Sequence, residues 1–134
     1  MKNKILLVEG DVDNKNRLVR FFAERDFSMT AVNSEENGLL LMKYIHFDVA
    51  IVEFCENGKP ADTICKEIRD HADKTGLILM CSHQSPDIER KARQFAPAFY
   101  FVKPVNLDDL YAVVLRLFEI KWKKQQQVKN YSEK

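Results

Sequence analysis

The sequence predicts an α/β protein whose five-stranded parallel sheet is covered by helices on both faces. Two short runs, residues 4–8 and 49–52, are apolar throughout, which is typical of strands buried on both faces of a parallel sheet. Stretches with helical apolar spacing separate the strand-like runs along the chain. Such alternation favours strand–helix–strand crossovers within one sheet.

The composition fits one globular domain. The chain has 134 residues, of which 46% are hydrophobic and 31% charged, with a net charge of +1. These values exclude a disordered chain and point to neither nucleic acid nor a membrane as a partner. No apolar run approaches the length of a membrane span, and the amino-terminal stretch is too short and too acidic for a signal peptide. We therefore expect a cytoplasmic protein.

The three cysteines, Cys55, Cys65 and Cys81, are odd in number and form no CxxC or Cys/His pattern. We expect reduced thiols and no zinc site. A buried cysteine usually behaves as a small hydrophobic residue, which is the plainer alternative to redox sensing by Cys55 or Cys81.

The first half of the chain predicts two strands and two helices before the central strand. Residues 4–8 form the first strand and end in Glu9-Gly10-Asp11. Residues 13–25 form a helix, and residues 27–32 form an outer strand. This helix has Leu18, Phe21 and Phe22 on its apolar face and Asn14, Lys15, Arg17 and Glu24 on its outer face. Ser34 is an N-cap candidate for a helix that runs to about residue 44.

The central strand, residues 49–52, is bracketed by Asp48 and Glu53. A loop over 54–60 contains an Asn-Gly turn signal, and a helix with Ile64 and Ile68 inward follows over 61–71.

Residues 77–81 and 99–102 are the last two predicted strands. Between them, Ser85 and Pro86 mark the start of a fourth helix, and Asn106 caps a long fifth helix. The apolar face of the fifth helix contains Leu110, Val113, Val114 and Leu117. Residues 1–120 thus form the domain, and the basic, polar residues 121–134 either extend the last helix or form a tail.

Polar residues follow four of the predicted strands. Glu9 and Asp11 follow the first, Glu53 ends the third, Cys81 and Ser82 end the fourth, and Lys103 follows the fifth. The carboxyl ends of parallel strands meet at one edge of a sheet, where sites in such folds gather. The sequence therefore predicts a shared pocket at this edge.

Over roughly residues 3–120, the order of these parts resembles a response-regulator receiver domain (CheY-like) of two-component signalling. That family has an acid pair after strand 1, a phosphoacceptor Asp ending strand 3 and Ser or Thr ending strand 4. It also has a switch aromatic in strand 5, with Lys-Pro after it. The matching positions hold Glu9-Gly10, Glu53, Cys81 or Ser82, Tyr100, and Lys103-Pro104. The spacing from Glu53 to Arg69 also matches the family's usual spacing from the phosphoacceptor to the Arg that closes the third helix.

The resemblance implies a flavodoxin-like strand order of 2-1-3-4-5, counted along the chain. It also implies protein partners, namely a histidine kinase, a phosphotransfer protein or a downstream signalling protein. These partners would bind the surface of helix 4, strand 5 and helix 5. The same surface could also form a homodimer.

The site departs from the family at the positions that carry its chemistry. Receivers hold Mg²⁺ with carboxylates, and Gly10 replaces the acid that is usually the main ligand. Glu53 is longer than Asp by one methylene, which moves its carboxylate by roughly 1.5 Å, and in-line transfer depends on finer positioning. We expect no cofactor and at most weak Mg²⁺ binding through Glu9 and Asp11.

We therefore interpret the chain as a pseudo-receiver, a signalling module that is not an enzyme. One alternative is a working receiver that uses Glu9 or Asp11 for Mg²⁺ and an acid at or near Glu53 as acceptor. Another is a flavodoxin-like redox protein, but Glu9-Gly10-Asp11 would repel the phosphate that such proteins bind after strand 1.

Two side-chain positions follow from the resemblance. Lys103 is expected to pair with Glu53 across a peptide that is cis in the family. Tyr100 is expected in one outward rotamer, because Cys81, if it holds the hydroxyl position, is a poor hydrogen-bond donor. Each of these residues also has a plainer interpretation. Glu9 and Asp11 would favour the start of the helix that follows them, Lys103 would lie in a turn, and Tyr100 would be a core aromatic.

Overall fold

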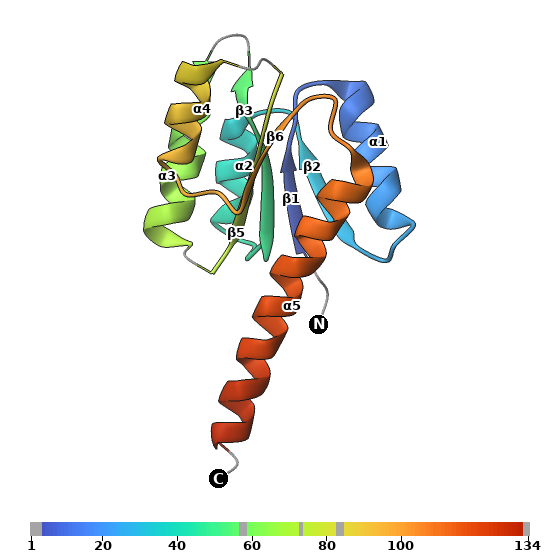
Figure 1. The fold of residues 1–134 in the computed structure, drawn as a ribbon, viewed down its shortest axis with the longest axis vertical. Helices are drawn as coiled ribbons and strands as arrows, with labels where there is room; N and C mark the ends of the chain where they lie inside the picture. The colour runs from blue at the N-terminus through green and yellow to red at the C-terminus, as the bar shows by residue number, and fades with distance from the viewer. Residues whose placement is uncertain (1–3, 57–58, 73, 83–84, 133–134) are drawn as a thin grey trace.

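The computed structural model describes residues 4–56, 59–72, 74–82 and 85–132. Its strands are β1 (Lys4–Val8), β2 (Ser28–Val32), β3 (Val49–Glu56), β4 (Lys59–Pro60), β5 (Gly76–Cys81) and β6 (Phe99–Val102). Its helices are α1 (Val12–Ala23), α2 (Glu35–Met42), α3 (Asp62–His71), α4 (Pro86–Arg93) and α5 (Leu107–Ser132). Figure 1 shows the sheet between two layers of helices.

The sheet order is β2-β1-β3-β5-β6, and all of these neighbours pair in parallel. The predicted strand order is confirmed, with β5 and β6 as the predicted fourth and fifth strands. The short β4 is an addition that pairs antiparallel with the end of β3. The central strand therefore lies at the middle of the sheet, as the apolar run of residues 49–52 predicts.

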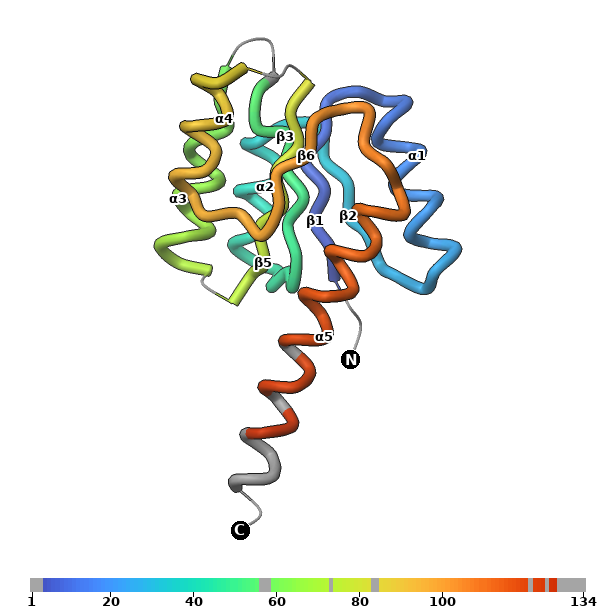
Figure 2. Tube along the Cα trace, in the orientation of Figure 1, coloured from blue at the N-terminus to red at the C-terminus, as the bar shows by residue number. Residues whose placement is uncertain are grey.

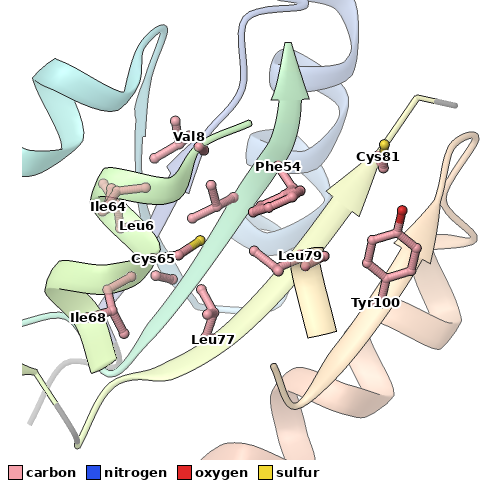
Figure 3. Packing of buried hydrophobic residues seen from close by; sticks show 14 of the residues in the cluster. Leu6, Val8, Phe54, Ile64, Cys65, Ile68, Leu77, Leu79, Cys81 and Tyr100 are labelled. Carbon is pink, nitrogen blue, oxygen red and sulfur yellow. The ribbon is translucent and has the colours of Figure 1, made fainter. Parts of the chain in front are cut away.

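Two hydrophobic layers cover the two faces of the sheet. Ala50 and Val52 of β3 face the layer formed with α2, α3 and α4, part of which is shown in Figure 3. Val49 and Ile51 face the layer formed with α1 and α5. Successive residues of a strand point to opposite faces, so a continuous apolar run serves both layers.

Local capping signals place most helix starts. The side chains of Ser34, Ser85 and Asn106 each accept a hydrogen bond from a backbone N–H in the first turn of the helix that follows. Helix α1 begins at Val12, one residue earlier than predicted, because Asp11 is its N-cap. One acid of the predicted pocket thus has a structural role.

The end of β3 differs from the predicted loop. The strand continues to Glu56, and its register against β5 shifts between Glu53 and Cys55. Such a bulge re-aims the side chains that follow it. The chain then turns back so that Pro60 pairs with Cys55. The predicted Asn-Gly turn at 57–58 lies outside the described residues.

Helix α5 runs well past the sheet. It spans 26 residues, and its carboxyl-terminal half projects from the body of the fold, away from the carboxyl ends of the strands (Figures 1 and 2). Trp122 on this projection is 61% exposed. Among the described residues, no helix has the length and apolar character needed to cross a membrane.

Candidate functional site

Four predicted residues meet at the carboxyl edge of the sheet. Glu9 follows β1, Glu53 lies near the end of β3, Ser82 follows β5 and Lys103 follows β6. Direct contacts between their side chains connect all four. The predicted convergence of strand ends thus produces a compact polar cluster.

Lys103 joins the two carboxylates of the cluster. Its Nζ lies 2.8 Å from each carboxylate oxygen of Glu9 and 3.0 Å from Oε2 of Glu53. The predicted Lys103–Glu53 pair is confirmed, and Glu9 is a second, closer partner that was not predicted. The Lys103–Pro104 peptide is cis. One ammonium therefore lies beside two buried acids.

Glu9 is fully buried, and protein donors surround its carboxylate. Besides Lys103, the backbone N–H of Asp11 donates to Oε1 at 3.0 Å and the side-chain amide of Asn14 donates to Oε2 at 2.9 Å. Burial raises the pKa of Glu9, but interactions with Glu53, Lys103, Asp11 and Asn14 outweigh it and leave that pKa lowered. Glu9 is therefore held ionised.

Asn14 is a site residue that the sequence pattern missed. Helical spacing placed it on the outer face of α1, and that prediction is wrong, because its amide contacts the buried Glu9. Only its position one turn after the strand end could have suggested this contact. A polar residue at that position is equally common on a solvent-exposed helix face.

Glu53 has a different environment from Glu9. Its side chain is 9% exposed, and its Oε1 accepts a hydrogen bond from Ser82 Oγ at 3.3 Å. Burial, followed by its proximity to Glu9, raises the pKa of Glu53 to about 7, although Lys103 acts in the opposite direction. Near neutral pH this carboxyl is therefore partly protonated, while Glu9 carries the charge.

The donor set does not fit Mg²⁺ in this arrangement. Asp11 accepts the backbone N–H of Asn14 as the cap of α1, and Lys103 lies between Glu9 and Glu53. Within the described part of the chain, no group of three His, Cys, Asp or Glu residues is arranged to hold a metal ion. Mg²⁺ requires near-octahedral oxygen ligands at short distances, and here both Glu9 and Glu53 are in contact with an ammonium.

The two candidates for the switch hydroxyl occupy different places. Ser82 reaches Glu53, whereas Cys81 is fully buried in the layer beneath, on the side of α2, α3 and α4. Ser82 is therefore the side chain that can respond to residue 53.

The predicted outward position of Tyr100 is wrong. Tyr100 is only 8% exposed and packs in the same layer as Cys81, with the Arg93 guanidinium 5.7 Å from its ring centre. The prediction assumed that Cys81 would hold the hydroxyl position, but Ser82 makes the contact to Glu53. Figure 3 shows Tyr100 beside Cys81. Burial and the Cys81 thiol raise the pKa of Tyr100.

A hollow of about 390 Å³ lies next to Glu53. It is lined by Val8, Gly10, Ser34, Glu35, Glu36, Glu53, Lys59 and Ala61. Gly10 contributes no side chain to it, and Lys59 comes from the added strand β4. The charged residues of its wall are therefore three acids, Glu35, Glu36 and Glu53, and one lysine on the β4 side.

Comparison with known proteins gives a curated relative and several solved structures. No family model matches the chain. The chain is 27% identical over 118 residues to the regulatory protein AtoC of Escherichia coli, covering 88% of this chain. It spans about a quarter (26%) of the length of that protein.

Solved receiver structures superpose on the fold at low sequence identity. The signal receiver domain of an HD domain-containing protein from Pseudomonas fluorescens matches with a TM-score of 0.84 at 18% identity, over 92% of this chain and 99% of that one. The chemotaxis response regulator CheY4 of Vibrio cholerae matches with a TM-score of 0.76 at 16% identity, over 87% and 99%. Together with the sheet order, these matches show that the chain has the fold of a CheY-like response-regulator receiver domain.

Proposed function

We propose that this chain is a pseudo-receiver of two-component signalling that acts by binding other proteins and undergoes no phosphorylation cycle. The observation that carries the proposal is the contact of Lys103 with both Glu9 and Glu53. The resemblance already implies a lysine contact with residue 53, so the contact of Lys103 with Glu9 is the distinguishing one, because it engages the remaining acid of the pair beside Gly10. Glu9 accepts hydrogen bonds on both carboxylate oxygens, whereas Oε2 of Glu53 lies 3.0 Å from the ammonium but has no hydrogen-bond partner among the described residues.

The second support is the identity of the acids. Gly10 offers no carboxylate, and the Asp11 side chain caps α1. Recruiting Asp11 to a metal would uncap the helix, at a cost of about 1 kcal/mol. Glu9 would also have to leave donors at 2.8 to 3.0 Å. The alternative of a working receiver therefore has to break contacts that already stabilise the fold.

The third support is the state of the switch residues. The resemblance implies that phosphorylation draws the hydroxyl side chain toward residue 53 and lets the aromatic follow inward. Ser82 already contacts Glu53, and Tyr100 is already buried. A side chain can bias a two-state element through contacts made in one state only. Glu53 makes such a contact and favours the inward state of Tyr100 without a phosphoryl group.

The partners in this proposal are a histidine kinase, a phosphotransfer protein or a downstream signalling protein. The surface is that of α4, β6 and α5, on which Phe99 is 48% exposed and Ile120 is 39% exposed. Exposed apolar side chains of this size are the usual anchors of protein interfaces. A homodimer through the same surface would appear as a doubled mass in light scattering and would be lost in Phe99→Glu.

Intact-mass spectrometry after incubation with Mg²⁺ and acetyl phosphate tests the absence of phosphorylation. We expect the natural chain to gain no phosphoryl group. The double variant Gly10→Asp/Glu53→Asp restores both acids of the family pattern and is the matched positive control. A phosphoryl group on the natural chain that is lost in Glu53→Gln would place the acceptor at Glu53 and overturn the proposal.

A further inference from the structure

Two thiols lie opposite each other directly beneath the polar cluster. In the pairing of β3 with β5, Cys55 is the register partner of Cys81. Cys55 comes two residues after Glu53, and Cys81 comes directly before Ser82. Neither is in a disulfide. The pair therefore connects the two strand ends that hold the site.

The bulge in β3 turns both thiols to the same side of the sheet. With regular alternation, Cys55 would share a face with Glu53 and lie opposite Phe54. The register shift between Glu53 and Cys55 instead leaves both Phe54 and Cys55 in the layer that contains Cys81. The spacing of the two cysteines in the sequence gives no sign of this arrangement.

The separation of neighbouring strands suits a disulfide. Adjacent strands lie about 4.7–4.9 Å apart, and disulfides join Cα atoms that are about 4.4–6.8 Å apart. The two residues are paired at the ends of their strands, next to the bulge, where the backbone can adjust most easily. Cys55 is 6% exposed and Cys81 is fully buried, so a small oxidant reaches Cys55 first.

We propose that Cys55 and Cys81 form a redox modification site, at which a peroxide converts the two thiols into a disulfide between β3 and β5. The Cys55 thiolate attacks one peroxide oxygen, the O–O bond breaks, and a sulfenic acid and one water are produced. The Cys81 thiolate then attacks this sulfur, the S–O bond breaks, and a second water leaves. Two thiols lose two electrons in total, and the peroxide is reduced to water.

The disulfide would act on the site through the backbone. It would tie the strand that carries Glu53 to the strand that leads into Ser82, and it would remove the Cys81 thiol next to Tyr100. This inference does not depend on the proposed function, because it concerns thiols that neither a phosphorylating nor a non-phosphorylating site would use.

Cys65 is an internal control within the same chain. It is buried on a different element, α3, in the same hydrophobic layer. Burial, followed by the charges of Glu35 and Asp62, raises the pKa of its thiol to about 12. A thiol that stays protonated is a poor nucleophile. Cys65 should therefore stay reduced under conditions that oxidise Cys55 and Cys81.

The test is alkylation and peptide mapping of the full chain after mild treatment with hydrogen peroxide under native conditions. Separate samples, one untreated and one treated with peroxide, are then alkylated in denaturant. The number of alkylated cysteines should fall from three to one, with Cys65 as the alkylated residue and Cys55 linked to Cys81. Dithiothreitol should restore all three, and Cys65→Ser should form the same bridge.

Three outcomes would overturn the proposal: a bridge that includes Cys65, a bridge between two chains, or oxidation of single thiols without a bridge. Persistence of three alkylatable thiols after native treatment would overturn it too. The variant Cys55→Ser should keep two alkylatable thiols, whereas Cys81→Ser should form no bridge, because the sulfenic acid at Cys55 then has no Cys81 thiol to attack it. The mapping of the natural chain decides the question even where a variant folds poorly.

Discussion

Ion pairs occur in two very different regions of this molecule. In the site, Lys103, Glu9 and Glu53 have side chains that are 15%, 0% and 9% exposed. On α5, Arg116 and Glu119 form a pair at 3.4 Å with side chains that are 67% and 58% exposed. Water solvates the second pair whether or not it forms, whereas the buried charges depend on each other. This difference in burial explains why ion pairs are central to the site in one region and contribute little to the structure in the other.

The largest expected effect comes from removing the shared cation. Lys103→Met would leave two buried carboxyl groups without their ammonium. We expect a loss of about 3–5 kcal/mol in the free energy of unfolding at neutral pH, measured by urea denaturation. Adding Glu53→Met to Lys103→Met should recover part of the loss. An unchanged urea midpoint in Lys103→Met would show that the cluster contributes no more than a surface pair.

The second effect is a pH dependence that belongs to Glu53. Its pKa is raised from 4.5 to about 7 in the folded chain, so the native state binds this proton more tightly than the unfolded chain. The contribution of Glu53 to stability should therefore fall as pH rises through that window, by on the order of 3 kcal/mol. Glu9, whose pKa is lowered, contributes in the opposite sense, with stability lost as pH falls below 4.5.

The difference in unfolding free energy between the natural chain and Glu53→Gln measures the titration of Glu53 together with its coupling to Glu9. Glu36→Gln, at an exposed acid on α2, is the matched control and should follow the natural chain at every pH. Parallel pH profiles for the natural chain and Glu53→Gln would contradict the buried-acid account.

The third effect separates a helix cap from a metal ligand. Asp11→Ala should lower the free energy of unfolding by about 1 kcal/mol, because the backbone N–H of Asn14 loses its acceptor. The loss should be the same with and without millimolar Mg²⁺. Ser34→Ala removes the cap of α2 and is the control of similar size. A gain in the melting temperature on adding Mg²⁺, abolished by Asp11→Ala, would instead support the working-receiver alternative.

The smallest effect is expected for the exposed ion pair on α5. Arg116→Gln should change stability by no more than about 0.5 kcal/mol. The change should disappear in high salt, because screening weakens exposed pairs most. A salt-independent loss approaching that of Lys103→Met would mean that burial is not what separates the two regions.

Much of the fold could be read from local patterns. The apolar runs 4–8 and 49–52, the caps Ser34, Ser85 and Asn106, and the polar strand ends all correspond to features of the structure. Each depends on residues close together in the chain, whose geometry is set by backbone hydrogen bonding and side-chain periodicity. The resemblance then placed Lys103 next to Glu53, and the two groups are in contact.

The partnerships within the site required the folded chain. Glu9 as the closer partner of Lys103, Asn14 as a donor to Glu9, and Ser82 as the contact of Glu53 all join residues from different elements. Tyr100 lies inward, in one layer with Cys81 and with the Arg93 guanidinium 5.7 Å from its ring centre, and no local pattern contains these contacts.

Local sequence patterns thus indicated most of the strands and helices and the edge at which polar residues gather, and the resemblance supplied the strand order. The tertiary structure decided which side chain each polar group contacts, and it made neighbours of Cys55 and Cys81 through a single bulge. The physical reason is the distance along the chain over which each effect acts. Periodicity and capping act within a few residues. Burial, which sets the strength of the charge and thiol interactions here, exists only after distant strands have packed.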